Sequence, residues 1–451
     1  MLKISNDLFN FVVMRPLYLF VWFCLSYSLR LFFKRVELLN APKSFFGRTI
    51  YVSNHPASFM DPLVISCFRR PILFFMTRSD VFTPISRPIL WLVHMLPIYR
   101  QIDGVNTKDK NQEVFKECSK VLKGKRNLLI FGEGFTDDVF VRRLKPIKKG
   151  AVRIGFSALD AMNWSEKVYL AAVGCNYSDP SRMRSDLLIA TSDQICLNDF
   201  KDAYEANSNK VISELTNKLD LLMKSQITHV ENPHLVHLHE GIMILTRRGM
   251  NAESYDSELT LIERFEYSKK IALWLNNNSF ETLEPIKERI EFYFNVLKNN
   301  DLTDDELWRL KENKIFIKEK FLKILVLLPF SVLGILHCAI PYLITKKFVE
   351  GKFKRPVFWS STKMLVSMIL IGILNIPVIF FIVDFFSVSV YYGLCYYLLI
   401  GIFGLSAYRV MVLIKQIIRY KSLRKRDLHD IFEERERTFE FLKITIPEEF
   451  S

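Results

Sequence analysis

The chain has 451 residues, of which 50% are hydrophobic and 24% charged, and 38 are phenylalanines. This composition is too apolar for a disordered chain and has no collagen or solenoid bias. The 62 basic and 48 acidic residues leave a net charge of +14, which suits a polyanionic partner, either nucleic acid or an anionic membrane surface.

An apolar run lies near the N-terminus, from Leu17 to Phe33, and Arg30 interrupts it. Basic residues flank the run on both sides, and no small-residue cleavage site follows it. We therefore expect residues 1–36 to form a membrane anchor or an interfacial segment that is not removed.

Short apolar strands alternating with longer helices follow, a pattern typical of an α/β sheet covered on both faces. The expected strands are 49–52, 72–75, 128–131 and 168–173, and the expected helices are 83–96, 109–122 and 148–159. Residues 37–200 are thus predicted to form an α/β domain with a mixed sheet flanked by helices. Residues 201–320 have a charged, helical pattern, with a candidate strand at 241–245, and are expected to be a helical extension.

Three long uncharged runs come next, at 324–344, 364–383 and 385–408. Each has about the 20 residues that a helix needs to cross a ~30 Å hydrocarbon core. We therefore expect C-terminal membrane helices within residues 321–415. Residues 416–451 are expected to be a cytoplasmic tail that is first basic and then acidic.

Charge gives an expectation for topology, because basic loops stay in the cytoplasm. Basic residues precede the first run, separate it from the second, and follow the third. If only the last two runs cross, as a hairpin turning at 384–389, every basic segment stays inside. Pro329 and Pro341 weaken a straight span in the first run, so 324–344 is expected to be re-entrant or interfacial. The prediction is an integral membrane protein with its α/β domain on the cytoplasmic face, and a basic tail that contacts anionic lipid rather than nucleic acid.

Ligands collect at the C-terminal ends of strands in open α/β sheets. The first expected strand runs into Asn-His-Pro-Ala-Ser-Phe-Met-Asp-Pro, which contains His55 and Asp61. Such a pair can work as a base and its orienter, because the carboxylate fixes the imidazole tautomer and the other ring nitrogen takes a proton. The alternative is a loop histidine with Asp61 capping the next helix.

Two arginines follow the second expected strand. Arg78 ends the sequence Met-Thr-Arg, and Arg100 ends the apolar turn Leu-Pro-Ile-Tyr-Arg. A guanidinium binds oxyanions with two parallel hydrogen bonds, so either arginine suits a phosphate. A solvated surface arginine is the alternative for each.

The third expected strand ends in Gly132-Glu133-Gly134, where the glycines allow a ligand to approach the backbone closely. A plain turn is the alternative. A basic cluster follows and opens a helix, whose N-terminus favours anions; it consists of Arg142, Arg143, Lys145, Lys148, Lys149 and Arg153.

Taken together and in this order, the four strand ends resemble the glycerolipid acyltransferase family, which includes glycerol-3-phosphate and 1-acylglycerol-3-phosphate acyltransferases. The family has Asn-His, four residues and Asp; then an apolar turn ending in Arg; then Phe-Pro-Glu-Gly-Thr-Arg/Ser and a Lys-Lys-Gly helix start; then a Val-Pro-Val-type strand. The counterparts here lie within about residues 48 to 177, somewhat under a third of the chain.

Several positions depart from the family pattern. Five residues separate His55 from Asp61, as in a longer-spaced subgroup that includes fungal glycerol-phosphate acyltransferase-like enzymes. Gly132 replaces the proline of the third block, Phe135 intrudes before Thr136, and no arginine follows. Gly174 stands where the fourth block often has proline. Arg142, Arg143 and Lys149 are the candidates to supply the missing charge.

The resemblance implies acyl transfer from a thioester to a glycerol-type hydroxyl, with His55 as the base and Asp61 as its orienter. Backbone N–H groups near Gly132 to Gly134 are candidate donors to the tetrahedral oxyanion. The acceptor would be held by the substrate-binding set Arg78, Arg100, Glu133, Gly134, Arg142 and Lys149.

The implied partners are acyl-CoA or acyl carrier protein as donor, a glycerophospholipid-type acceptor and an anionic membrane surface; no metal or cofactor is implied. The favoured acceptor is lysophosphatidic acid (1-acylglycerol-3-phosphate). Glycerol-3-phosphate and other lysophospholipids remain open. So does a non-enzymatic alternative, a membrane-tethered lipid-binding scaffold on a degenerate acyltransferase fold.

Overall fold

The computed structural model describes residues 6–41, 47–68, 73–84, 86–98, 107–312 and 316–447. The chain divides into two compact units, each assembled from separate segments. The first consists of Met1–Leu29, Val36–Asn176 and Leu187–His229, and the second of Arg30–Arg35, Tyr177–Asp186 and Val230–Ser451.

An eight-stranded sheet organises the first unit. Its strands are β1 (Arg35–Leu39), β2 (Thr49–Ser53), β3 (Leu73–Arg78), β4 (Met95–Ile98), β5 (Asn127–Phe131), β6 (Tyr169–Tyr177), β7 (Asp186–Thr191) and β8 (Ile195–Cys196). The order is β1-β7-β6-β2-β5-β3-β4, with β8 beside β6. β2 runs parallel to both β5 and β6, whereas β8 is antiparallel to β6, so the sheet is mixed as predicted. All five residues of β2 are buried, as expected for a central strand covered on both faces.

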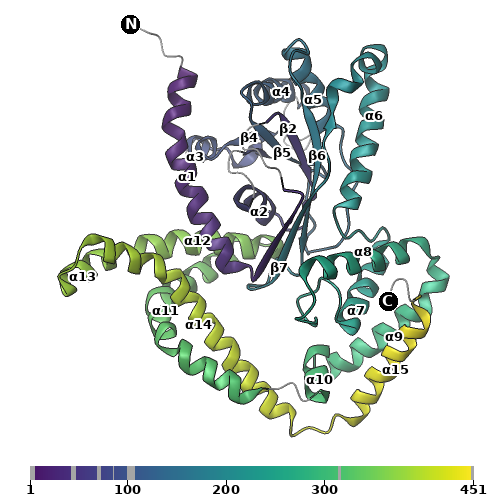
Figure 1. The fold of residues 1–451 in the computed structure, drawn as a ribbon, viewed down its shortest axis with the longest axis vertical. Coiled ribbons are helices and arrows are strands. Elements are labelled where there is room, and N and C mark those ends of the chain that lie inside the picture. Colours follow the sequence, from purple (N-terminus) through teal and green to yellow (C-terminus); the bar gives the residue numbers. More distant parts are fainter. Residues whose placement is uncertain are drawn as a thin grey trace. The chain divides into compact units, whose positions relative to one another are not determined.

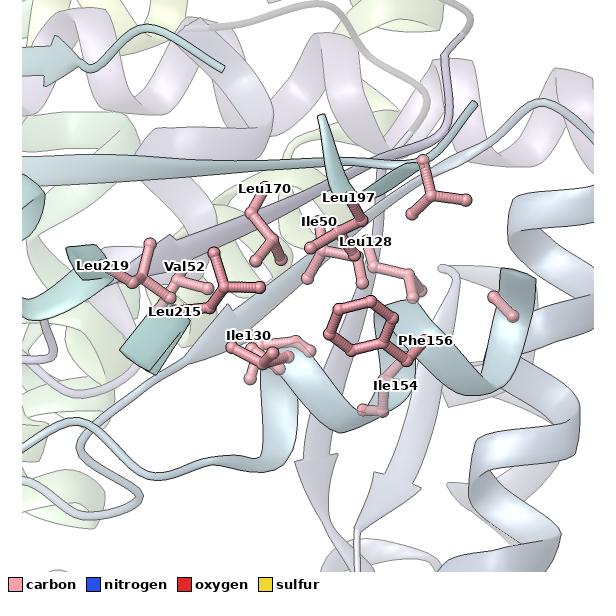
Figure 2. Packing of buried hydrophobic residues seen from close by; sticks show 14 of the residues in the cluster. Ile50, Val52, Leu128, Ile130, Ile154, Phe156, Leu170, Leu197, Leu215 and Leu219 are labelled. Atoms are coloured by element: carbon pink, nitrogen blue, oxygen red, sulfur yellow. The ribbon is translucent and has the colours of Figure 1, made fainter. Parts of the chain in front are cut away.

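Helices from the same part of the chain complete the sheet domain. They are α2 (Met60–Phe68), α3 (Ser86–Leu92), α4 (Thr107–Lys123), α5 (Gly150–Ala161) and α6 (Lys201–Ser225). Figure 2 shows the strand residues Ile50, Val52 and Leu128 packed near Phe156 of α5 and Leu215 of α6. The residues of α6, which lie in the expected helical extension, thus contribute to the core of the sheet domain.

The expected helix over 83–96 is wrong in part. The structure has the shorter helix α3 and then the strand β4, which pairs with β3. The apolar sequence Met95-Leu96-Pro97-Ile98 fits a strand at the edge of a sheet. Proline has no backbone N–H to donate, and on the free side of an edge strand no such donor is needed.

The N-terminal apolar run forms α1 (Asn6–Phe32), which continues through Pro16. Its Tyr18 is buried and stacks on the ring of His94 at 4.2 Å between ring centroids, and His94 in turn stacks on Phe74 of β3 at 4.1 Å. Phe20 and Phe23 are exposed. α1 therefore has one side packed on the sheet domain and another that presents apolar side chains.

A cluster of helices forms the core of the second unit. Its members are α7 (Val236–Thr246), α8 (Leu261–Asn277), α9 (Phe280–Asn299), α10 (Asp304–Lys311) and α15 (His429–Thr445). Capping boxes begin α8 at Thr260 and α10 at Thr303. The candidate strand at 241–245 is wrong, because these residues belong to α7. The final helix α15, in the expected tail, packs into the core of this cluster.

Between α10 and α15 in the sequence come four apolar helices: α11 (Ile317–Lys352), α12 (Trp359–Leu374), α13 (Ile376–Phe386) and α14 (Val390–Leu423) (Figure 1). Three segments are long and apolar enough to cross a membrane, namely α11, residues Pro356–Phe386 and α14. They contain the first two predicted apolar runs and most of the third, and their exposed leucine, isoleucine and phenylalanine side chains suit lipid. The structure therefore has helices long and apolar enough to cross a membrane where the sequence predicts them.

Candidate active site

The first motif lies in the loop that leaves the central strand β2. Asn54 ties this loop to β6: its side-chain oxygen accepts from the Cys175 N–H at 2.8 Å, and its amide donates to the Cys175 carbonyl at 3.1 Å. Both Asn54 and Cys175 are buried. The loop is thereby held at the carboxyl end of two adjacent parallel strands, where α/β sheets place their ligands.

His55 and Asp61 meet at this strand end. The His55 Nδ1 lies 2.9 Å from the Asp61 Oδ2, although five residues separate them. The same Asp61 oxygen accepts from the Ala57 N–H at 2.9 Å, which bends the loop so that the two side chains face each other. Asp61 is fully buried, whereas 20% of the His55 side chain is exposed. With Asp61 ionised, Nδ1 carries the proton and Nε2 presents a lone pair, so the pair has the geometry of a general base and its orienter.

The strand β5 supplies a packing partner to His55, and the turn that follows it supplies a positioning carboxylate. The ring of Phe131 stacks on the imidazole at 4.1 Å between centroids, which limits its rotation. The buried Glu133 accepts the backbone N–H of His55 at 2.9 Å and also a backbone N–H of Lys145. Glu133, predicted to hold substrate, thus bridges the His55 loop and the segment after β5.

The environment of Glu133 makes it sensitive to pH. Burial raises the pKa of its carboxyl to about 7, against the opposing effects of the His55 N–H and the Lys145 charge. Because the folded pKa lies above the ordinary value, this group stabilises the fold below about pH 4.5. That contribution is lost as pH rises through about 7.

We therefore expect Glu133→Gln to gain stability relative to the wild type on going from pH 4.5 to 8, by roughly 3 kcal/mol at about 1.4 kcal/mol per pKa unit. Thermal unfolding followed by intrinsic fluorescence at several pH values measures this difference. The exposed Glu117→Gln should show no such trend. A Glu133→Gln difference that is flat across this range would contradict the assignment.

Two glycines shape the turn around Glu133. A Cβ at Gly132 would lie 2.8 Å from a Val52 methyl carbon, so a proline there would require Val52 to move. Gly134 has a φ of +78°, which favours glycine. The N–H groups of Gly132 and Gly134 already donate to Ser53 and Phe131 carbonyls. They are therefore not free to serve as the expected oxyanion donors.

Two lysines approach this turn. A Cβ at Gly134 would lie 2.7 Å from the Lys148 Nζ, so this amino group rests against the backbone of the turn. Lys148 is exposed and makes no ion pair within the part of the chain that the structure describes. The Lys145 Nζ lies 2.9 Å from Asp137 Oδ1 and 4.0 Å from the centroid of the Phe135 ring. Both lysines belong to the basic cluster found in the sequence. Their spacing in the sequence does not show that they, and not the other members of the cluster, lie near this turn.

The remaining predicted residues lie elsewhere or cannot be placed. Arg142 is buried, with its guanidinium 5.0 Å from the centroid of the Phe140 ring. Lys149 donates to Ser213 on α6 at 2.6 Å. Arg78 lies in β3, but its side chain is outside the described part, as is the whole of Arg100. The structure therefore brings together His55, Asp61, Glu133 and Gly134 of the predicted set.

Comparison with known proteins defines the class to which this domain belongs. Residues 35–175 match the model of the Acyltransferase family, and they contain the whole His55–Asp61–Glu133 arrangement. This part of the chain is an acyltransferase-family domain.

A particular solved structure is also similar, the crystal structure of the 1-acyl-sn-glycerophosphate (LPA) acyltransferase PlsC from Thermotoga maritima. The match has 15% sequence identity and a TM-score of 0.29, and it covers 49% of this chain and 84% of that one. No curated protein sequence matches the chain.

Proposed function

We propose that the protein transfers a fatty acyl group from acyl-CoA or acyl carrier protein to the hydroxyl of 1-acylglycerol-3-phosphate. The observation that carries this proposal is the contact between His55 Nδ1 and the buried Asp61 within an acyltransferase-family domain. This contact leaves Nε2 for a substrate hydroxyl. The proposed setting is the cytoplasmic face of a membrane, with the C-terminal helices as anchor.

The reaction follows from what His55 can do. Its Nε2 takes the proton of the acceptor hydroxyl as the oxygen attacks the thioester carbonyl. The imidazolium is stabilised by Asp61, which accepts from Nδ1–H. Collapse of the tetrahedral intermediate forms the ester and breaks the carbon–sulfur bond, and the proton on Nε2 passes to the leaving thiolate. No enzyme nucleophile is needed, because the acceptor oxygen attacks directly.

For the acceptor phosphate, Lys148 and Lys145 are better placed than Lys149 or Arg142. Lys148 lies against the Gly134 backbone, next to the carboxylate that holds the His55 loop. Lys145 is paired with the half-exposed Asp137, a contact that a phosphate can replace. Lys149 and Arg142 are instead engaged with Ser213 and Phe140. The two lysines thus provide the charge that an arginine after the third block would supply.

We expect Lys148→Ala to raise the KM for a phosphorylated acceptor by roughly tenfold to a hundredfold, because a charge-assisted hydrogen bond contributes about 1.5–3 kcal/mol. The KM for acyl-CoA should change little. Initial rates at varied acceptor concentration measure this effect. Lys120→Ala removes an exposed lysine of α4 and is the matched control. An unchanged acceptor KM in Lys148→Ala would contradict the phosphate assignment.

Two alternatives involve the same acyl transfer with a different acceptor, either glycerol-3-phosphate or a lysophospholipid with a head group. The contrasting alternative is a lipid-binding scaffold, which the departures in the third block motivate. An assay of free thiol released from acyl-CoA separates these readings. We expect release from membranes containing the protein only when a phosphorylated acceptor is added, and not with glycerol or monoacylglycerol. Acyl-CoA binding without acceptor-dependent thiol release would favour the scaffold.

A further inference from the structure

Two exposed aromatic side chains border the strand end that holds His55. Phe59 belongs to the loop between β2 and α2, and Phe135 follows the turn after β5. Their exposed fractions of 37% and 55% separate these rings from the buried core. Because β2 and β5 are neighbouring parallel strands, the loops that follow them lie at the same edge of the sheet. We call Phe59 and Phe135 the apolar rim of the site.

The local structure around Phe59 leaves its ring exposed. Its neighbours Ser58 and Met60 are both buried, and so is Asp61. Ser58 has a φ of +52°, a left-handed conformation that is uncommon for a residue other than glycine. The Asp61 N–H donates to the Ser58 carbonyl at 3.2 Å and closes the turn. The turn thus buries the residues on both sides of Phe59 and keeps this apolar ring at the surface.

Phe135 lies directly beside the turn that positions His55. It follows Gly134 immediately, and Glu133 one residue earlier accepts the His55 N–H. The centroid of the Phe135 ring is 4.0 Å from the Lys145 Nζ, and the Phe135 carbonyl accepts from the same amino group at 3.5 Å. An apolar ring and a lysine ammonium are therefore direct neighbours close to the base.

This combination indicates the form of the ligand. Single exposed phenylalanines are common on protein surfaces and need no explanation. Here, however, the exposed ring lies beside a cation, and the two suit a ligand whose anionic group and apolar chain are joined by a short linker. In 1-acylglycerol-3-phosphate, glycerol alone joins the phosphate to the acyl chain. Glycerol-3-phosphate has the same anionic group but no chain.

We propose that the apolar rim contacts the acyl chain of the acceptor and thereby selects 1-acylglycerol-3-phosphate over glycerol-3-phosphate. This inference rests on the proposed function, in which Lys145 and Lys148 hold the acceptor phosphate. With the phosphate on these lysines and the free hydroxyl at His55, the acyl chain starts at the strand end that the rim borders. Each methylene group that leaves water against the rim then adds to the affinity.

The acyl chain of the donor fits this position less well. In acyl-CoA the long pantetheine arm separates the thioester from the nearest phosphate. The acyl chain and the phosphates of the donor therefore cannot occupy neighbouring positions. A ring 4.0 Å from a lysine that holds phosphate suits the acceptor instead.

Binding of acceptors to the full chain tests the proposal. The protein is held in amphipol, which contains no bilayer, and no acyl-CoA is added. Isothermal titration calorimetry measures the affinities for glycerol-3-phosphate and for 1-decanoylglycerol-3-phosphate. The variants are Phe135→Ser and the conservative Phe135→Leu. The matched control is Phe292→Ser, which changes a phenylalanine of α9 that is 54% exposed.

We expect the wild type to bind the decanoyl acceptor more tightly than glycerol-3-phosphate. Phe135→Ser should weaken binding of the decanoyl acceptor by about fivefold to thirtyfold, because part of an apolar contact is lost. Its affinity for glycerol-3-phosphate should not change. Phe135→Leu should keep most of the preference for the decanoyl acceptor, and Phe292→Ser should keep all of it.

Three results would overturn the proposal. Equal weakening of both acceptors in Phe135→Ser would mean that the ring only orients Lys145. Unchanged affinities would mean that the ring has no ligand contact, as expected if it only docks on a bilayer. A wild type without preference for the decanoyl acceptor would show that no chain is bound at the rim.

These measurements need no turnover, so they separate this inference from the proposed reaction. Chain-dependent binding that Phe135→Ser removes, without formation of an acylated product, would support the rim and refute the reaction. Product formation without chain-dependent binding would support the reaction and refute the rim.

Discussion

Replacing His55 with alanine is expected to lower kcat/KM for acyl transfer by about 10²–10⁴-fold, the usual contribution of a general base. The acceptor hydroxyl is a weak nucleophile at neutral pH, and loss of the imidazole leaves it without a proton acceptor at the strand end. The loss should be in kcat as well as in kcat/KM, because the contact is made as the proton moves. The initial rate of ester formation at saturating acceptor measures this effect.

Asp61→Asn should reproduce much of that loss, because the amide cannot stabilise the imidazolium as a carboxylate does. It differs from His55→Ala in one respect: Asp61 is fully buried and also holds the Ala57 N–H, so its loss should lower stability too. His55 is partly exposed, so His55→Ala should unfold close to the wild-type temperature. A His55→Ala protein that melts normally and retains full activity would refute its role as the base.

The second large effect concerns stability. Asp186→Ala is expected to destabilise the second unit by about 3–5 kcal/mol, because it removes one partner of a buried ion pair. Arg264 is fully buried and donates to Asp186 at 2.7 Å, and Arg35 forms a second salt bridge with Asp186 at 2.8 Å. Without the carboxylate, the charge of Arg264 remains inside the fold with backbone carbonyls of Gly249 and Asn251 as partners.

The same site has a pH signature. Burial alone would raise the pKa of Asp186, but hydrogen bonds and charges from Arg35 and Arg264 hold it below its ordinary value. The pair therefore stabilises the fold above the ordinary pKa of an aspartate, and this stability is lost as pH falls through the lowered value. Unfolding by urea in detergent, at neutral pH and in acid, measures both effects. Asp179→Ala, on a partly exposed aspartate of the same segment, is the control, and an Asp186→Ala loss below about 1 kcal/mol would contradict the account.

The sheet was predictable from the sequence where its strands are buried on both faces. The continuous apolar runs of β2, β5 and β6 stand out between polar segments, and the structure confirms them. β4 was missed because Met95–Ile98 follows a helical pattern directly and contains Pro97. Its assignment as a strand depends on pairing with β3, a long-range contact that local periodicity does not contain.

Much of the candidate site followed from motifs, although the contacts around them did not. The order of strand-end residues pointed to His55 and Asp61, and the structure brings them within 2.9 Å of each other. That Glu133 holds the His55 backbone could not be predicted, because it depends on β5 lying beside β2. Within the basic cluster, the chain path after Gly134 decides which lysine faces the turn, and sequence spacing does not reveal that path.

The packing of distant segments was equally hidden. α15 follows the membrane helices in the sequence, yet Arg435 pairs with Asp304, far earlier in the chain. The sequence alone therefore predicts a separate polar tail, whereas the structure shows that the tail packs against the helices that precede α11. Tertiary contacts of this kind bring residues on both sides of the apolar helices into one core, which the sequence pattern alone does not show.

The most direct test of the proposed activity is product formation from labelled acyl-CoA in membranes that contain the protein. Lysophosphatidic acid and glycerol-3-phosphate are offered separately, and the lipid product is identified by its mass. We predict that lysophosphatidic acid yields a diacylglycerol phosphate, and that the product falls by about 10²–10⁴-fold in His55→Ala membranes. Absence of acylated product with either acceptor, or equal product in His55→Ala membranes, would contradict the account.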